Sequence, residues 1–162
     1  MAKNHWHPAF CGATEGEFKQ NKADLTFNTE KQISKEPLRM DLLIVKKQSG
    51  KVIKNDIGKI FRQHNVIEFK ATGDSLNIDD YYKVISYACL YKSLGKHVNE
   101  LPADEITITI MREAYPRELF GILKKSDIEI TEQYPGIYYL TGKVLFPTQI
   151  IVTKNWTTNM PD

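Results

Sequence analysis

The spacing of apolar and polar residues predicts one helix and two strands at the start of the chain. A broken apolar stripe with helical spacing predicts a helix over residues 9–25. Alternating residues then predict a half-buried strand over residues 25–33. Residues 39–47 form a further predicted strand, and its fully apolar centre predicts a position inside a sheet.

The middle of the chain carries sharper signals. Apolar residues around Glu68 and Lys70 predict a strand over residues 65–71. Asn77 is a typical helix N-cap, and two aspartates follow it in the first turn, where carboxylates suit the helix dipole. Apolar residues at helical spacing continue as far as Gly95, so this segment is predicted to be a helix.

The last third of the chain is rich in short alternating segments. They predict a strand over residues 105–111, a short helix over 116–124 and strands over 128–131, 137–140 and 149–153. The resulting order of elements indicates an α/β protein with a mixed sheet. Because no linker divides the chain, we expect a single domain over residues 1–162, with a core at about 6–112 and a β-rich C-terminal part at about 113–162.

Composition narrows the class of protein. The chain of 162 residues is 41% hydrophobic and 26% charged, which is typical of a soluble globular domain. Two cysteines are too few for a disulfide framework and favour a reducing compartment. No apolar run is long enough to cross a bilayer, and the N-terminus lacks a signal-peptide core. We therefore expect a cytoplasmic protein without a membrane partner.

The net charge of +2 gives no overall field that would attract a nucleic acid, but basic residues are concentrated locally. On charge alone this concentration is better explained by a solvated hairpin than by a binding surface. Beside an active site it would neutralise phosphates. The residues concerned are Lys46, Lys47, Lys51, Lys54, Lys59 and Arg62.

Three ionisable residues lie in predicted strands whose other residues have the apolar pattern of a buried core. Asp41 begins one apolar strand, and Glu68 and Lys70 share a face of another because they are two positions apart. Charges in such strands are costly unless they are paired or bind a metal. If the two strands are neighbours, two carboxylates and the backbone carbonyl of Phe69 make an oxygen-lined site suited to Mg²⁺ or Mn²⁺.

These charged residues have two explanations, a metal site and a structural ion pair. The residues alone favour neither. A metal held there would polarise a scissile phosphate and acidify a bound water, with Lys70 orienting that water or neutralising charge on the phosphate. Alternatively, Lys70 forms a structural ion pair with Asp41 or Glu68, since such networks also place charges in strands.

The order of these residues resembles a known family. Arg39-Met40-Asp41 followed by Ile67-Glu68-Phe69-Lys70 is similar to the motif of the PD-(D/E)xK nuclease superfamily, with Met40 where the motif's name places proline. More narrowly, the run from Ser34-Lys35-Glu36-Pro37 to Tyr87-Ala88-Cys89-Leu90-Tyr91 resembles the recombination-promoting nuclease/putative transposase relatives. The resemblance covers roughly residues 6–95.

The resemblance implies a fold and a site. The fold would be a restriction-endonuclease-like core of helix, mixed central sheet and helix, with a β-rich C-terminal extension. Asp41 and Glu68 would bind Mg²⁺ (or Mn²⁺), Lys70 would be the catalytic lysine, and a glutamate of the first helix would complete the metal site. Glu17 is our choice for that glutamate, and Glu15 is the alternative.

The expected activity is therefore metal-dependent endonucleolytic hydrolysis of DNA phosphodiester bonds. Two other classes remain open from the sequence: a catalytically inactive nucleic-acid-binding module, and a structural module, each retaining the nuclease fold. Metal binding separates the three classes, because the binding module holds DNA without metal and the structural module holds neither.

Overall fold

The structure, a computed structural model, describes residues 7–27, 33–34, 37–48 and 50–156. The chain divides into two compact units, Met1–Pro37 and Leu38–Asp162, which are described separately. In the described residues, no helix has both the length and the apolar character needed to cross a bilayer.

The first unit contains the helix α1 (His7–Glu17) and the short 3-10 helix η1 (Lys19–Asp24). The predicted single helix over residues 9–25 is thus interrupted at Phe18, which has φ −98° and ψ 16°. The predicted strand over residues 25–33 is not formed in its described part, because residues 25–27 and 33 have no regular secondary structure. Residues 28–32 lie outside the described residues.

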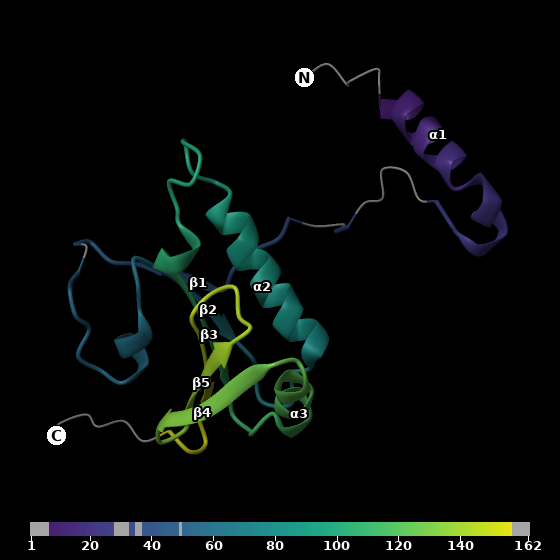
Figure 1. The fold of residues 1–162 in the computed structure, drawn as a ribbon. Helices are drawn as coiled ribbons and strands as arrows, with labels where there is room; N and C mark the ends of the chain where they lie inside the picture. The colour runs from purple at the N-terminus through teal and green to yellow at the C-terminus, as the bar shows by residue number, and fades with distance from the viewer. Residues whose placement is uncertain (1–6, 28–32, 35–36, 49, 157–162) are drawn as a thin grey trace. The chain divides into compact units, whose positions relative to one another are not determined.

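The second unit is built on a six-stranded sheet in the order β1-β2-β3-β6-β5-β4 (Figure 1). Strands β2, β3 and β6 are parallel to one another, whereas β1, β5 and β4 run antiparallel to their neighbours. The carboxyl ends of the three parallel strands therefore meet at one edge of the sheet, which we call the carboxyl edge. The strands are β1 (Leu42–Val45), β2 (His64–Phe69), β3 (Ile106–Arg112), β4 (Ile128–Tyr134), β5 (Ile137–Gly142) and β6 (Thr148–Val152).

Two helices, α2 (Ile78–Lys92) and α3 (Arg117–Lys125), pack on one face of this sheet (Figure 1). The core between them joins alternate strand residues to the inner faces of both helices, as the period of two in a strand and 3.6 in a helix requires. Its buried residues include Val66, Ile108, Ile110 and Ile150 of the sheet, Tyr81, Val84 and Ala88 of α2, and Leu119, Phe120 and Leu123 of α3.

The opposite face is covered by the segment between β1 and β2, which contains the short 3-10 helix η2 (Ile57–Ile60). The side-chain amide of Gln149 on β6 donates a hydrogen bond of 2.7 Å to the carbonyl of Ile57. A further 3-10 helix, η3 (Ala103–Glu105), leads directly into β3. The sheet is thus covered on one face by helices and on the other by this segment.

The α/β class, the mixed sheet and the strands and helices predicted after residue 64 are confirmed. The prediction that residues 39–47 lie inside the sheet is wrong. Among the described residues β1 pairs with β2 alone, and Leu42 and Ile44 remain partly exposed. In addition, β6 lies between β3 and β5, so C-terminal residues complete the central sheet and do not merely extend it.

Candidate active site

Asp41 and Glu68 face each other across the β1–β2 pair. The antiparallel register joins Leu42 to Ile67 and Leu43 to Val66, so its continuation places Asp41 opposite Glu68. Residues opposite each other in an antiparallel pair share a face, and Val66, two residues before Glu68, is buried in the core beneath α2. Both carboxylates therefore lie on the face that the helices cover, and Lys70 follows on the same side.

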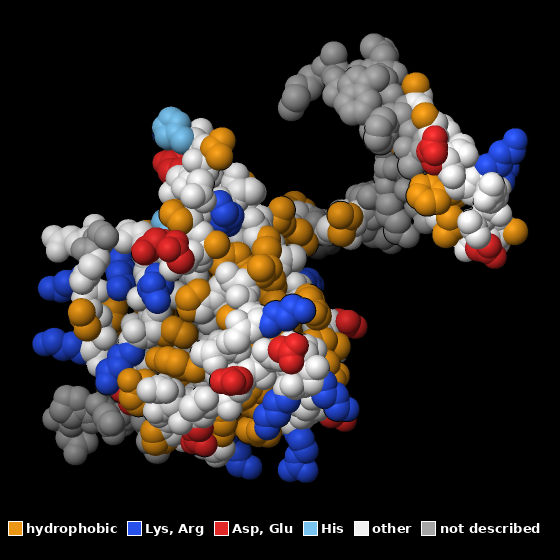
Figure 2. Space-filling view, in the orientation of Figure 1, with side chains coloured by type: hydrophobic (Ala, Val, Ile, Leu, Met, Phe, Trp, Pro, Cys, Tyr) orange, Lys and Arg blue, Asp and Glu red, His pale blue; other side chains and the backbone are white. Residues whose placement is uncertain are grey.

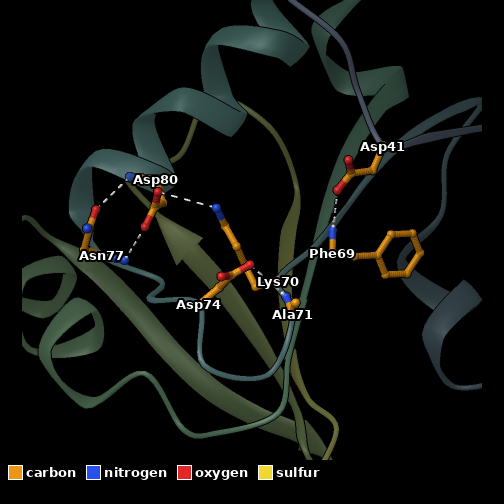
Figure 3. A network of polar contacts seen from close by, with 7 residues as sticks. All are labelled: Asp41, Phe69, Lys70, Ala71, Asp74, Asn77 and Asp80. Carbon is orange, nitrogen blue, oxygen red and sulfur yellow. Dashed lines mark hydrogen bonds and ion pairs between the residues drawn. The ribbon is translucent and has the colours of Figure 1, made fainter.

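The carboxylate of Asp41 is held in place by the end of β2. Its Oδ2 accepts a hydrogen bond of 2.9 Å from the backbone N–H of Phe69, the residue after Glu68 (Figure 3). This bond fixes one carboxylate oxygen against the strand that carries Glu68. The geometry explains why an exposed residue just before β1 takes part in the site.

The environment of Glu68 disfavours its negative charge. Burial raises the pKa of Glu68 from its usual 4.5, and the nearby negative charge of Asp41 raises this pKa further. The backbone N–H of Asp41 and the positive charge of Lys70 act in the opposite direction but do not reverse the shift. Moreover, Oε2 of Glu68 is buried without a hydrogen-bond partner. The pair thus presents two adjacent acids with one unsatisfied oxygen, an arrangement that a bound cation would stabilise.

Lys70 has its ion pair with a residue that the sequence did not single out. Its Nζ lies 3.4 Å from Oδ1 of Asp80, at the start of α2 (Figure 3). The Oδ2 of Asp80 accepts a hydrogen bond of 2.9 Å from the N–H of Asn77, and its own N–H donates one of 2.9 Å to the Asn77 side chain. This capping box fixes Asp80, so the ammonium group is held at the N-terminus of α2.

The alternative explanation from the sequence, a structural ion pair of Lys70 with Asp41 or Glu68, is not found among the described residues, where Lys70 pairs with Asp80. Asp41 and Glu68 carry like charges, so they do not form a charge pair with each other.

A groove of about 510 Å³ opens beside these residues at the carboxyl edge. Backbone hydrogen bonds continue past the strand ends there: the N–H of Lys70 donates to Met111 at 2.8 Å, and that of Thr153 donates to Arg112 at 2.8 Å. The groove is lined by Phe69, Lys70, Ala71, Thr72, Met111, Arg112, Glu113, Thr153 and Lys154. Lys70 therefore belongs both to this groove and to the site of Asp41 and Glu68.

Arg112 and Lys154 were not foreseen from the sequence. Each stands at or just after the end of a strand, and the signal for them was that parallel strands bring their carboxyl ends together. The sequence alone did not say which strands are parallel.

The basic stretch of residues 46–62 lies elsewhere. It leaves β1 after Val45, which pairs with His64 at the far end of β2 from Glu68, and its Ile57 contacts the opposite face of the sheet. Figure 2 shows basic side chains gathered over this segment. One of them, Lys59, forms an ion pair of 3.4 Å with Asp56 and lies 4.8 Å from the ring of Tyr134. The expectation that this stretch neutralises phosphates beside the acids is not supported by its position.

Glu17 and Glu15 are both exposed on α1, in the first unit, so the third metal ligand stays a prediction. Within the residues that the structure describes, no group of three or more His, Cys, Asp or Glu side chains could hold a metal. The predicted metal ligands among the described residues that lie together are the two carboxylates of Asp41 and Glu68. This number fits Mg²⁺, which usually binds through one or two carboxylates and completes its shell with waters and substrate phosphates.

Comparison with known proteins adds no relative to this picture. No protein-family model, curated protein or solved structure matches the chain. The case for a function therefore depends on the site itself and on the motif in the sequence.

Proposed function

We propose that this chain is a metal-dependent endonuclease that hydrolyses DNA phosphodiester bonds, built on a restriction-endonuclease-like core. One observation carries the proposal: Glu68, beside the like charge of Asp41, has a buried oxygen without a hydrogen-bond partner. Lys70 follows two residues later on the same face. The same three residues make up the motif that resembles the PD-(D/E)xK nucleases, so the geometry and the sequence support one assignment.

The donor set suits a hard divalent cation. Asp41 has one oxygen fixed by Phe69 and a second available, and Glu68 has an oxygen that no protein donor satisfies. Oxygen ligands of this kind favour Mg²⁺ or Mn²⁺ over softer metals. When bound, such an ion polarises a phosphoryl oxygen and lowers the pKa of a coordinated water.

The role of Lys70 follows from its charge and its support. Negative charge accumulates on the phosphate oxygens as the P–O bond is cleaved, and a fixed ammonium group beside them stabilises that charge. Asp80 holds the ammonium group at 3.4 Å, so the lysine does not have to be ordered during the reaction. Asp80 thus acts as a positioning residue for Lys70.

A second candidate is a catalytically inactive module that binds nucleic acid. The observation that favours it is the small set of described ligands, two carboxylates without a third side chain. A binding module of this kind would hold DNA equally well with and without a divalent cation.

A plasmid-nicking assay tests the proposal. We expect the parent to nick supercoiled DNA in Mn²⁺ or Mg²⁺ and to be inactive in EDTA. Glu68→Gln should remove both metal binding and nicking, whereas Lys70→Ala should remove nicking and keep the metal. Glu129→Gln, at an exposed position on β4, is the matched control for the loss of one carboxylate and should behave as the parent. A parent that binds DNA but never nicks it, with any divalent cation, would establish the binding module instead.

A further inference from the structure

The groove at the carboxyl edge is rich in positive charge. Lys70, Arg112 and Lys154 line it, and Glu113 is the only acidic residue among its lining residues. Thr72 and Thr153 add hydroxyl groups, which are able to donate hydrogen bonds to an anion. Because the chain as a whole has a net charge of only +2, this groove is a local concentration of cations.

The three cations lie at or just after the carboxyl ends of three neighbouring parallel strands. Phe69 pairs with Met111, so Lys70 is level with Arg112, and Arg112 pairs in turn with Val152, two residues before Lys154. Adjacent strands are about 4.8 Å apart, so a row across β2, β3 and β6 extends over roughly 10 Å. Such a row can contact an extended anion at more than one point.

Arg112 and Lys154 are available to a ligand. In the part of the chain that the structure describes, neither side chain forms an ion pair or a hydrogen bond with the protein. Lys59 and Lys70, in contrast, each have an acidic partner at 3.4 Å. Two unpaired cations side by side repel each other, and an anion between them would relieve that repulsion.

The groove also offers apolar surface. Phe69 and Met111 line it, and the side chain of Phe69 is 50% exposed. Phe69 and Met111 stand one position before Lys70 and Arg112 on their strands, so their side chains project to the opposite face of the sheet. The case for a polynucleotide strand therefore depends on the row of cations, which can contact successive phosphates.

We propose that Arg112 and Lys154 form a phosphate-binding subsite that holds a nucleic-acid strand beside the acids Asp41 and Glu68. The subsite deepens the proposed function and rests on it, because Lys70 lines the groove and also adjoins the acids. The phosphate held by Arg112 and Lys154 is a neighbour of the one that is attacked. These two residues bind and position the strand, and they take no part in the chemical step.

The test is strand binding without metal. Fluorescence anisotropy with a labelled single-stranded 20-mer, in EDTA, measures binding independently of cleavage. We expect the double variant Arg112→Ala/Lys154→Ala to bind about 10-fold or more weakly. The slope of log Kd against the logarithm of the salt concentration should be smaller than the parent's by about 1.4. The reason is that each lost phosphate contact on a single strand contributes about 0.7 to this slope.

The control is the double variant Lys125→Ala/Lys143→Ala, which loses the same charge. Both residues are exposed, and Lys143 follows β5 beside the amino end of β6, at the other end of the sheet from the groove. Equal weakening in the control would mean a general charge effect and would overturn the subsite. If inorganic phosphate displaced the 20-mer at concentrations similar to that of the oligonucleotide, the proposal that the groove binds a polynucleotide would be wrong.

The subsite and the nuclease fail in different ways. If nicking is absent but the groove variant still loses strand binding, the subsite holds and the nuclease proposal fails. If nicking depends on Glu68 but the groove variant keeps the parent's strand affinity and salt dependence, the nuclease holds and the subsite is wrong. A parent that does not bind the 20-mer at about 50 mM salt, where phosphate contacts are strong, also contradicts the subsite.

Discussion

Two groups of polar side chains on opposite faces of the sheet differ in how completely the protein satisfies their hydrogen bonds. On the face away from the helices, Asn65, Thr107, Thr109 and Gln149 are completely buried. On the face that the helices cover, Asp41 and Glu68 lie opposite each other at the carboxyl edge.

The first set is satisfied almost entirely within the protein. The hydroxyl of Thr107 donates to Oδ1 of Asn65 at 2.6 Å, and the Asn65 amide donates to the carbonyls of Ile44 and Arg62. The Gln149 amide donates to Thr109 at 2.9 Å. These bonds tie the sheet to the segment that covers it, which is a structural role.

The second set is satisfied only in part. Oε2 of Glu68 is buried without a partner beside a like charge. Oε1 of Gln149 also lacks a partner, but it is neutral, so its burial costs less than that of a carboxylate. The difference teaches that burial of polar groups alone does not mark a site. The mark is a carboxylate with a buried oxygen that no group of the protein satisfies.

The largest expected effect comes from Glu68→Gln. It should lower nicking by more than about 100-fold, since even the hydrogen-bond partners of metal ligands are worth about 10–100-fold in affinity or activity. The melting temperature of the metal-free variant should equal or exceed that of the parent, because the like-charge repulsion is removed. Calorimetric melts in EDTA beside the nicking assay check both. A large fall in melting temperature would mean that Glu68 is structural.

The opposite pattern is expected for Asn65→Leu. The substitution removes the hydrogen bonds of the Asn65 side chain with the carbonyls of Ile44 and Arg62, the N–H of Arg62 and the hydroxyl of Thr107. The free energy of unfolding should fall by about 2–3 kcal/mol, while nicking per folded molecule stays at the parent's level. Urea titrations measure the first quantity. Loss of nicking in a fully folded Asn65 variant would remove the distinction between the two faces.

A smaller effect is expected from Asp80→Asn. The amide keeps most of the capping box but loses the ion pair with Lys70, so the ammonium group is held less firmly. Nicking should fall by about 5–10-fold, and stability by about 0.5–1 kcal/mol, the usual range for a weakened cap. Turnover at saturating DNA is the informative quantity. A fall in DNA affinity with turnover unchanged would contradict a positioning role.

The smallest effect concerns pH. Because the pKa of Glu68 is raised in the folded protein, the folded state binds this proton more tightly than the unfolded chain does. Without metal, the contribution of Glu68 to the free energy of unfolding is therefore fully present below pH 4.5. It declines as the pH rises from 4.5 through the raised pKa of Glu68. The parent should lose melting temperature over that interval relative to Glu68→Gln. Parallel curves for the two proteins would contradict the shift.

Much of the second unit was predictable because its signals are local. Asn77 caps α2 as expected, and the apolar residues around Glu68 correctly placed β2. The closeness of Asp41 and Glu68 was predicted on the condition that their strands are neighbours, and β1 does pair with β2. These features depend on spacing and on residue preference, which the sequence displays directly.

What the sequence did not reveal depends on pairing between distant segments. The apolar run of β1 suggested an interior strand, yet its position at the edge is decided by which strands pair. Arg112 and Lys154 joined the site only because β3 and β6 are parallel to β2. Asp80 was recognised as a helix-start residue, but its ion pair with Lys70 required the helix to be placed over the sheet.

The most direct test of the central claim is Mn²⁺ binding to the metal-free protein. Electron paramagnetic resonance counts free Mn²⁺ during a titration at pH 7.5 and gives the number of ions bound. We predict one high-affinity site per chain that is lost in Glu68→Gln and retained in Lys70→Ala and Glu129→Gln. Equal Mn²⁺ binding by the parent and Glu68→Gln, or none by the parent, would contradict a metal site at Asp41 and Glu68.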